Sequence, residues 1–405
     1  MSELSVAAYF PWRRVRVAYQ DVIPASKMAM VRIEPDRRFH PRCHACGQPA
    51  RTVHSHARKF VQDLAFGECS MILQVEHRKV WCDRCGGVRV EFLEFVDASQ
   101  RVTHRLAAYA AELCRLGLTV TAVADHLGLD PKTVKAIDKA ALQTEFGETR
   151  YDGLTRLAID EIAVKKGHSY MTVVLDYDTG RVVWMGQGRE IASLDKFFEA
   201  MPAEVRDGIE AVAMDMWDAF IHCVKRWCPK ADIVFDGFHV IKAFNEVIDD
   251  IRNEEVRKAD AEGRQTLKGS KYLFLKNRSN LDREQRGRLD EILALNKRLN
   301  TTYWLKDFLK HIWGYVSPGC ADGAIAEWCA IAREDGHPAL VRFAKRLEKY
   351  RYGIINHCKH RMHTSGLEGV NNKIKVIKRN AYGFHDPEYF ALKVKQAFPG
   401  RYSAN

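Results

Sequence analysis

Two short apolar runs, each followed directly by an aspartate, constrain most strongly what this chain can fold into. The run LAI leads into Asp160, and the run VAM leads into Asp215. Short apolar runs of this kind are typical of buried strands, and the helical pattern after the second run favours an α/β arrangement. A carboxylate directly after a buried strand lies at the sheet edge, where it is held in place and still exposed. We therefore expect an α/β domain that presents Asp160 and Asp215 on one edge of its sheet.

A third acidic residue, Glu368, lies in the stretch from Gly366 to Arg379, which we expect to form an amphipathic helix. Its apolar residues recur at helical spacing and predict a buried face: Leu367, Val370, Ile374 and Ile377. Three polar residues lie at i+3, i+4 and i+7 from Glu368 and share its face: Asn371, Asn372 and Lys375. Two strand-borne carboxylates and one helix-borne carboxylate can converge and hold divalent metal ions for phosphoryl transfer.

Other acidic residues compete with Asp160 and Asp215 for this role. Asp160 could be a turn residue at a strand end, and Asp218 lies one helical turn after Asp215. Asp236, in VFDGFHV, also follows a strand and could be a fourth ligand or an orienting group together with His239. We keep Asp236, His239 and Asn372 as second-tier candidates.

Glu368 has the strongest competing interpretation. Ser365-Gly-Leu-Glu368 matches the capping box S-x-x-E, in which the glutamate only satisfies a backbone N–H at the start of a helix. However, the stretch from Lys345 to Arg379 contains ten Lys or Arg residues and two acids. An acid within so cationic a stretch suits a metal ligand beside a phosphate track.

The composition indicates a polyanionic partner and excludes some classes of protein. The formal net charge of +11 suits nucleic acid, although it also fits an ordinary basic protein. We find no run of about 18 uncharged apolar residues and thus predict no membrane span. The N-terminal MSELSVAAYFPWRRVR lacks the order of a signal peptide, so we expect a cytoplasmic protein. Eleven cysteines in such a chain favour metal binding or free thiols over a disulfide framework.

Two C-x-x-C pairs, Cys43 with Cys46 and Cys82 with Cys85, predict one structural Zn²⁺ held by four thiolates. A glycine follows each pair and tightens its turn. The 35 residues between the pairs exceed the usual spacer, so we expect a β-hairpin to fill the gap. Two unrelated reduced pairs are the alternative, and a nearby histidine could replace one cysteine: His40, His44, His54 or His56.

A helix-turn-helix is predicted in the segment VTAVADHLGLDPKTVKAIDKAAL. Gly128 ends its first helix, and Asp130-Pro131 begins the second as N-cap and first-turn residue. Apolar residues at helical spacing would pack this pair on a preceding helix over residues 106–116. The residues that we expect to contact DNA are Lys132, Thr133 and Lys135. An ordinary helical hairpin with a solvated basic face is the alternative.

At these residues the chain resembles bacterial insertion-sequence transposases of the ISL3 family, which are DDE enzymes. The resemblance covers nearly the whole length and includes CHAC, HSHARKFVQDL, HRKVWC and CDRC. It continues through LAIDEIAVKKGHSY, AVAMDMWDAF, VFDGFHVIKAF and TSGLEGVNNKIKVIKRNAYGF. The last four blocks, in this order and at this spacing, are specific to the family.

The resemblance implies an RNase-H-like mixed β-sheet core with an all-α insertion, preceded by a zinc ribbon and a helix-turn-helix. It implies that Asp160, Asp215 and Glu368 are the catalytic acids and bind two Mg²⁺ ions, or Mn²⁺ in their place. Lys373 and Lys375 would bind phosphates. We expect three tryptophans of the insertion to lie in its core rather than to serve as base-stacking platforms: Trp304, Trp313 and Trp328. We expect six segments: a β-hairpin segment 1–38, the zinc ribbon 39–98, the helix-turn-helix 99–148, the core 149–240, the helical insertion 241–350, and the second core part with the tail 351–405.

The same resemblance implies a reaction and its partners. The N-terminal modules would bind the terminal inverted repeats of the element, and the core would hydrolyse the phosphodiester at each end. The freed 3′-OH would then attack target DNA. We expect double-stranded DNA as the partner, a dimer or higher synaptic assembly, and association with the bacterial nucleoid when bound.

Three alternatives remain at this point. The chain could be a transposase-derived transcriptional regulator without catalysis, although none of the three acids is missing. It could be a structure-selective nuclease with the same core, which would leave the N-terminal DNA-reading modules unexplained. It could also be a zinc-structured interaction protein, which conflicts with the cationic stretch around Glu368.

Overall fold

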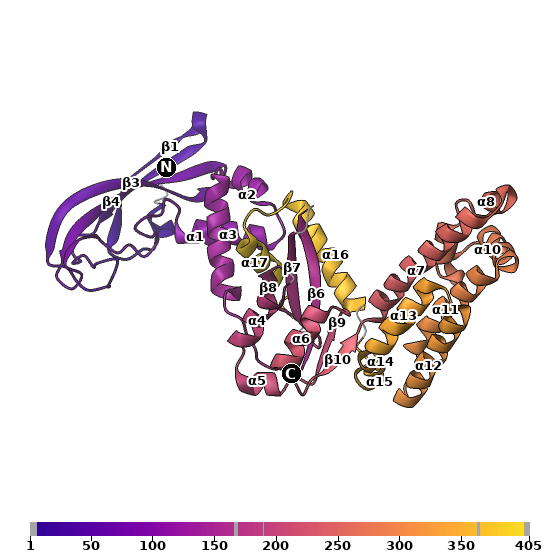
Figure 1. Cartoon of the computed structure of the whole chain (residues 1–405). Helices are drawn as coiled ribbons and strands as arrows, with labels where there is room; N and C mark the ends of the chain where they lie inside the picture. Colours follow the sequence, from indigo (N-terminus) through magenta and orange to yellow (C-terminus); the bar gives the residue numbers. More distant parts are fainter. Residues whose placement is uncertain (1–5, 166–168, 189, 363–364, 401–405) are drawn as a thin grey trace. The chain divides into compact units, whose positions relative to one another are not determined.

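The computed structural model describes residues 6–165, 169–188, 190–362 and 365–400. The side chains of residues 6–7, 164–165, 169 and 365–368 lie outside the described part. The chain divides into two units, Met1–Gly147 and Glu148–Asn405, and each has its own mixed β-sheet (Figure 1).

The first unit begins with a short 3-10 helix, Val6–Tyr9, and a curved sheet of order β1-β2-β4-β3. Its strands are β1 (Val15–Ile23), β2 (Met28–Pro35), β3 (Thr52–Phe66), β4 (Cys69–Cys82) and β5 (Gly87–Val90). Hairpins join β1 to β2 and β3 to β4, whereas β2 and β4 are parallel, and β5 pairs with β4. One face of the sheet is buried by alternate apolar residues such as Ile33, Val61 and Leu73. The β3–β4 hairpin occupies the long interval between the two cysteine pairs.

Three helices follow in the first unit: α1 (His104–Arg115), α2 (Val120–Leu127) and α3 (Pro131–Phe146). Thr119 caps the start of α2 and Asp130 caps α3, and each side chain accepts a hydrogen bond from a backbone N–H. Gly128 ends α2 with a φ of 63°, a left-handed conformation that glycine adopts without strain. The helices share a small core that includes Ala110, Val123 and Val134.

The second unit has a five-stranded sheet of order β10-β9-β6-β7-β8. Its strands are β6 (Arg156–Lys165), β7 (Ser169–Asp176), β8 (Val182–Gln187), β9 (Ala211–Met214) and β10 (Asp232–Phe235). The strands β6, β9 and β10 are parallel to one another, while β7 and β8 are antiparallel to their neighbours. The turn between β7 and β8 places Gly180 at a φ of 72°.

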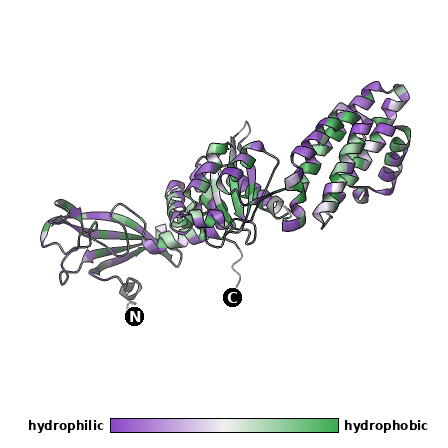
Figure 2. Cartoon of the chain, turned by 60° about the horizontal axis from the view of Figure 1, so that its bottom comes forward, coloured by the Kyte–Doolittle hydropathy of each residue, from purple (hydrophilic) through white to green (hydrophobic). Residues whose placement is uncertain are grey.

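Helices cover both faces of this sheet, because its strands are apolar on both sides. Ile159, Val212 and Met214 belong to one core, which includes apolar residues of α4 and α6. Ala158 and Ala213 belong to a second core, which includes Ile374 of α16 and Phe390 of α17. These helices and the short α5 span α4 (Ile191–Ala200), α5 (Ala203–Asp207), α6 (Asp218–Trp227), α16 (Ser365–Asn380) and α17 (Pro387–Ala397). Figure 2 shows hydrophobic residues on the strands of this sheet and also on the helices of the insertion.

Between β10 and α16 the described residues form helices and no strand. They are α7 (Gly237–Lys258), α8 (Ala261–Leu267), α9 (Lys271–Leu275), the 3-10 helix Arg278–Asn280, α10 (Arg283–Leu295), α11 (Lys297–Ile312), α12 (Pro318–Asp335), α13 (Pro338–Lys349), α14 (Arg351–Ile355) and α15 (His357–His360). Trp328 is fully buried and packs against Phe244 and Phe343. Trp313 is partly buried. Trp304, by contrast, is 49% exposed, so its predicted place in the core is wrong. In the described parts of the chain, no helix is long and apolar enough to cross a membrane.

Candidate functional site

Three aspartates lie near the carboxyl ends of β9 and β10 in the second unit. Asp215 follows β9 directly, whereas Asp160 lies within β6, which continues to Lys165, so it is neither a residue after the strand nor a turn residue as the sequence suggested. Ala158 of β6 pairs with Ala213 of β9, so Asp160 and Asp215, each two residues on, lie at the same level. Asp236 follows directly after β10, and Phe235 pairs with Met214, the residue before Asp215. The strands β9 and β10 end at the level of Asp160 on β6, so this topology brings the three carboxylates to one end of the parallel ladder.

Asp160 is held by groups from two elements. The backbone N–H of Glu161 donates to its Oδ1 at 2.7 Å, and the side-chain Nδ2 of Asn371 donates to its Oδ2. Asn371 lies on α16, which packs against β6 through Ile374. The α16 helix therefore brings a side chain from the far end of the chain onto the carboxylate of Asp160.

His239, in the first turn of α7, lies between the other two aspartates. Its Nδ1 faces Oδ1 of Asp215, and its Nε2 is 3.8 Å from Oδ2 of Asp236. Asp236 caps α7, since its Oδ1 accepts a hydrogen bond of 2.8 Å from the N–H of Phe238. Burial lowers the pKa of His239, and the carboxylate of Asp160 acts in the opposite direction. The imidazole is thus favoured in its neutral form and is close enough to sense all three acids.

Glu368 lies on α16, one helical turn before Asn371, but its side chain is outside the described part. Two roles were predicted for Glu368, metal ligand and helix cap. Both depend on its side chain, which lies outside the described residues, so both stay predictions. Asn372 and Lys375 are exposed on the same helix. The Nζ of Lys373 donates to the carbonyl of Ala397 at 2.8 Å and lies over the ring of Phe398.

Asp218, the rival of Asp215, belongs to a different cluster. Its carboxylate accepts hydrogen bonds from Nζ of Lys349 and from the hydroxyl of Tyr350, at 2.8 to 2.9 Å. These contacts lower the pKa of Asp218, with the hydrogen bond from Lys349 as the largest cause. Asp218 is therefore bound to α13 and its C-terminal neighbour Tyr350.

The aspartates offer hard oxygen ligands of the kind that Mg²⁺ prefers. Oδ1 of Asp215 is a buried atom that accepts no hydrogen bond of acceptable geometry among the described residues, although His239 faces it. Among the described residues, however, the four paired cysteines are the one group whose ligand atoms lie within 4.8 Å of one another. The aspartates therefore offer the oxygen ligands that a magnesium site uses. Their carboxylate oxygens do not all lie within 4.8 Å of one another, as the sulfurs of the cysteine cluster do.

The four predicted zinc ligands do come together in the first unit. Sγ of Cys43 lies 3.9 Å from that of Cys85, and Sγ of Cys46 lies 3.6 Å from that of Cys82. Four sulfurs placed 2.3 Å from a tetrahedral centre would be about 3.8 Å apart. Burial alone would raise the pKa of the Cys43 thiol, but backbone N–H groups, led by that of Cys46, lower it to about 7. The cluster could bind a zinc ion.

The glycines after the cysteine pairs have the conformations that such turns need. Gly47 and Gly86 adopt φ values of 70° and 61°. At Gly47 the backbone N–H also donates to the carbonyl of Cys43 at 2.9 Å. These turns wrap the backbone around each sulfur pair.

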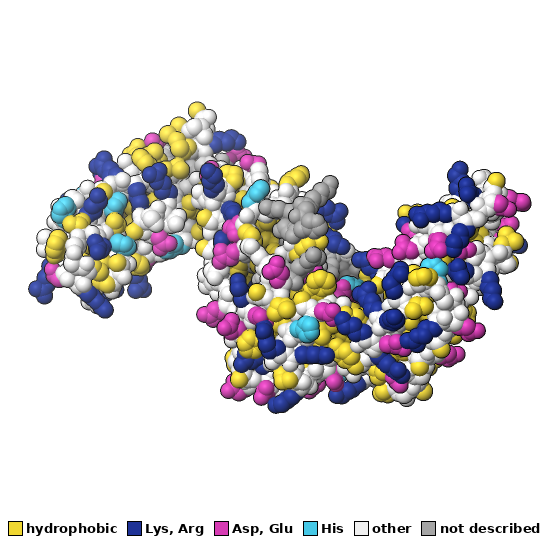
Figure 3. All heavy atoms as spheres, in the orientation of Figure 1, with side chains coloured by type: hydrophobic (Ala, Val, Ile, Leu, Met, Phe, Trp, Pro, Cys, Tyr) yellow, Lys and Arg dark blue, Asp and Glu magenta, His cyan; other side chains and the backbone are white. Residues whose placement is uncertain are grey.

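The predicted DNA-contacting residues lie at the start of α3. Lys132 is exposed, and Thr133 and Lys135 are half-buried. Lys132 and Thr133 also line a hollow between α1 and α3. In Figure 3, Lys, Arg and His side chains are spread over the visible face of the first unit.

Comparison with known proteins identifies the family. A family model described as a transposase, DDE_Tnp_ISL3, matches residues 157–394, which is more than half of the chain. The chain belongs to the ISL3 family of transposases. A model of the helix-turn-helix domain of transposase family ISL3 matches residues 91–142 and includes most of the three helices of the first unit. The resemblance drawn from the sequence motifs is confirmed.

Two curated relatives agree with this assignment. The chain is 43% identical over 361 residues to the transposase for insertion sequence element IS1001 of Bordetella parapertussis, covering 88% of this chain and 89% of the relative. It is 29% identical to the transposase for insertion sequence element IS1557 of Mycobacterium tuberculosis, covering 89% and 86%. As an ISL3 transposase the chain is a DNA transposase, and its DDE domain implies the use of divalent metal ions.

Sequence reasoning missed one residue of the ISL3 site, Asn371. We placed it on the polar face of its helix but chose its neighbour Asn372 as the candidate. The strand pattern carried the missing signal, because Ala158 and Ile162 face the core that α16 covers, and Asp160 lies between them on the same face of β6. The residue on α16 that meets Asp160 must therefore lie beside Ile374, which Asn371 does.

Proposed function

We propose that this transposase binds the terminal inverted repeats of its insertion sequence and catalyses DNA cleavage and strand transfer with Asp160, Asp215 and Glu368. The observation that carries the proposal is the convergence at one sheet edge. Asp160 and Asp215 come from adjacent parallel strands, and Asn371 joins the Glu368 helix to Asp160. In chain order, the three acids belong to a first strand, a second strand and a helix that follows the insertion. This order agrees with an RNase-H-like core interrupted by a helical insertion.

Divalent metal ions, Mg²⁺ by our proposal, would be held by the three acids. When bound, such ions lower the pKa of an attacking oxygen and stabilise the charge on the leaving oxygen. The chain's own residues prepare the ligands. Asn371 and the N–H of Glu161 fix the two oxygens of Asp160, so its carboxylate cannot rotate freely. The neutral His239 orients Asp215 without adding a positive charge that would compete for it.

The remaining modules would recognise the DNA. The first unit, with its four-cysteine cluster and its helix-turn-helix, would read the inverted repeats through Lys132, Thr133 and Lys135. Lys375 is exposed on the Glu368 helix and would steady phosphates near the reacting strand. Lys373 would do so only after leaving the carbonyl of Ala397. Because two ends must be joined, we propose a dimer or a higher assembly on DNA.

A strand-cleavage assay on a labelled duplex that carries the element end tests this proposal. With Mg²⁺, the wild type should nick at the end, whereas Glu368→Gln should bind the duplex without cutting it. If the wild type binds and does not cut with any divalent metal, the chain is a DNA-binding regulator. If both proteins cut alike, Glu368 is only a helix cap and the third ligand lies elsewhere.

A further inference from the structure

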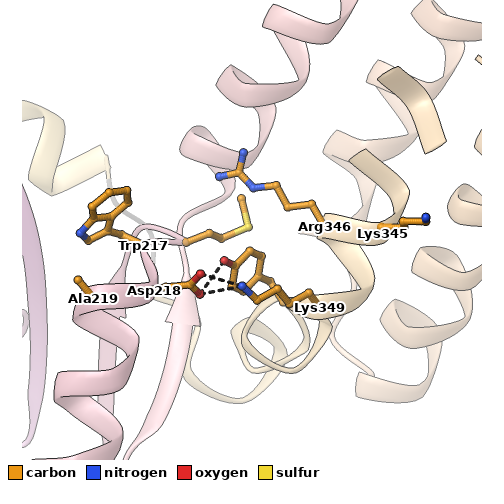
Figure 4. Close-up of a pocket in the computed structure, with 8 residues that line it drawn as sticks. Trp217, Asp218, Ala219, Lys345, Arg346 and Lys349 are labelled. Atoms are coloured by element: carbon orange, nitrogen blue, oxygen red, sulfur yellow. Dashed lines mark hydrogen bonds and ion pairs between the residues drawn. The ribbon is translucent and has the colours of Figure 1, made fainter. Parts of the chain in front are cut away.

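A cavity of about 560 Å³ lies next to the candidate active site, between the sheet domain and the helical insertion. One wall is the segment from Met216 to Ala219, at the start of α6. The other wall is the end of α13 together with Tyr350. Figure 4 shows the two walls joined by hydrogen bonds from Lys349 and Tyr350 to Asp218. The cavity is large enough for a group the size of a nucleotide.

Trp217 forms one end of this cavity and is tied to the active-site strand. It lies two residues after Asp215, and its backbone N–H donates to the carbonyl of Asp215 at 2.8 Å. Two residues span at most about 7 Å of chain. The indole of Trp217 is 43% exposed.

The opposite wall is cationic. Lys345 and Arg346 are exposed, and neither side chain makes an ion pair or a hydrogen bond within the described residues. The one acid in the lining, Asp218, is already bound by Lys349. Figure 4 shows the side chain of Arg346 extending from α13 towards the segment that contains Trp217, whereas the side chain of Lys345 points away from it. The cavity therefore has one uncompensated positive charge, that of Arg346, on the side opposite Trp217.

This combination fits a specific chemical class. An exposed indole offers a stacking surface for a base, and an Arg near it attracts a phosphate. A paired base cannot stack on a side chain without leaving its helix, so the group that fits is an unpaired nucleotide. The position of Trp217, two residues after Asp215, puts such a nucleotide beside the strand that would be cut.

We propose that this cavity holds an unpaired nucleotide adjacent to the cleavage site, with its base stacked on Trp217 and its phosphate against Arg346. The inference rests on the proposed function, because the active site must act on DNA at that edge. Removing a base from its duplex costs a few kcal/mol, and stacking on an aromatic side chain offsets that cost. Trp217 would thus position the strand and take no part in the chemistry.

The test uses element-end duplexes carrying 2-aminopurine at each position around the cleavage site. Binding of the wild type should increase the fluorescence of one of these bases, because it leaves the stack of the duplex. Trp217→Ala should bind the duplex with unchanged affinity, abolish that increase and slow cleavage about 5- to 150-fold. Trp217→Phe should restore most of both signals. Trp304→Ala, which removes an exposed tryptophan of the insertion that does not line the cavity, should behave as the wild type.

A second substrate separates positioning from a general structural effect. An end duplex with a mismatch at the responsive position has already lost the pairing, so Trp217→Ala should lose less activity on it. If the variant loses equal activity on paired and mismatched duplexes, or none on either, the inference is wrong.

The outcome also distinguishes this inference from the proposed function. Cleavage by the wild type without any 2-aminopurine response would leave the function intact and overturn the nucleotide site. A response that depends on Trp217, with no cleavage by the wild type under any divalent metal, would support the nucleotide site and contradict the catalytic proposal.

Discussion

The amide of Asn371 donates a hydrogen bond to Oδ2 of Asp160, although 211 residues separate the two in the chain. The contact joins α16, which contains Glu368, to β6, which contains Asp160. Among the described residues, this contact connects the helix of Glu368 to the carboxylate of Asp160. The helical insertion lies between them in sequence and leaves the contact undisturbed.

The first prediction concerns this contact. Asn371→Ala should slow metal-dependent cleavage about 10- to 150-fold, because a hydrogen bond to a charged group is worth roughly 1.5–3 kcal/mol. End binding, measured by gel shift, should stay unchanged. Asn372→Ala removes an exposed neighbour of the same type and serves as the control. Equal rates for the two variants would show that Asn371 does not position Asp160.

A second prediction concerns the four cysteines of the first unit. The purified protein should contain about one zinc ion per chain, measured by plasma mass spectrometry, and Cys46→Ser should lose it. Because structural zinc contributes directly to folding, the variant or a chelator should lower the melting temperature of the first unit and abolish end binding. Cys320→Ser, at an exposed cysteine of the insertion, is the control. Full zinc content in Cys46→Ser would contradict the four-thiolate site.

The third prediction tests the helix-turn-helix contact. Lys132→Ala should weaken binding to all DNA sequences at low salt and reduce the slope of log K against log salt by about 0.9. This follows if Lys132 contacts one phosphate. Lys230→Ala, at a lysine of the second unit paired with Asp207, should leave the slope unchanged. An unchanged slope for Lys132→Ala would place the DNA on another surface.

A fourth prediction concerns stability. Lys306 is buried in the insertion, where its Nζ donates to the carbonyls of Phe274, Leu275 and Lys276. Burial lowers the pKa of Lys306 to about 7, whereas the unfolded chain keeps the ordinary value of 10.5. Between these values the unfolded state binds more protons, so the unfolding free energy should rise with pH, by at most about 1.4 kcal/mol per unit.

Urea unfolding at pH 7, 8 and 9 checks this, with Lys306→Met compared to the wild type. As pH rises, the unfolding free energy of the wild type should increase relative to that of Lys306→Met. Lys310→Met alters a nearby lysine that pairs with Asp307. The unfolding free energy of this variant should change with pH as that of the wild type does. A constant difference between Lys306→Met and the wild type would mean that Lys306 keeps its ordinary pKa.

Local sequence patterns were enough to predict much of the fold. The strand runs before Asp160 and Asp215, the β1–β2 hairpin and the helix pair around Gly128 all follow from short-range spacing. The four cysteines were predictable as a group because a thiolate pair and its glycine form a local unit. These features depend on backbone preferences and hydrophobic periodicity, which a single sequence displays.

The contacts between distant elements were not predictable in the same way. Asn371 rather than Asn372 meets Asp160, because the rotation of α16 about its axis is set by packing against β6. Asp218 binds Lys349, 131 residues away, since the insertion folds back onto the sheet domain. Trp304 was expected in the core of the insertion yet lies exposed, because tertiary packing decides which side of a helix is covered.

The most direct test of the central claim is strand transfer by the purified protein. A donor DNA with two element ends would be incubated with a target plasmid and Mg²⁺, and the junctions would be sequenced. The wild type should join the 3′ ends of the element to the target, and Asp215→Asn should form the same protein–DNA complex without any joined product. Joined products from Asp215→Asn at the wild-type rate would contradict a catalytic site built on Asp160, Asp215 and Glu368.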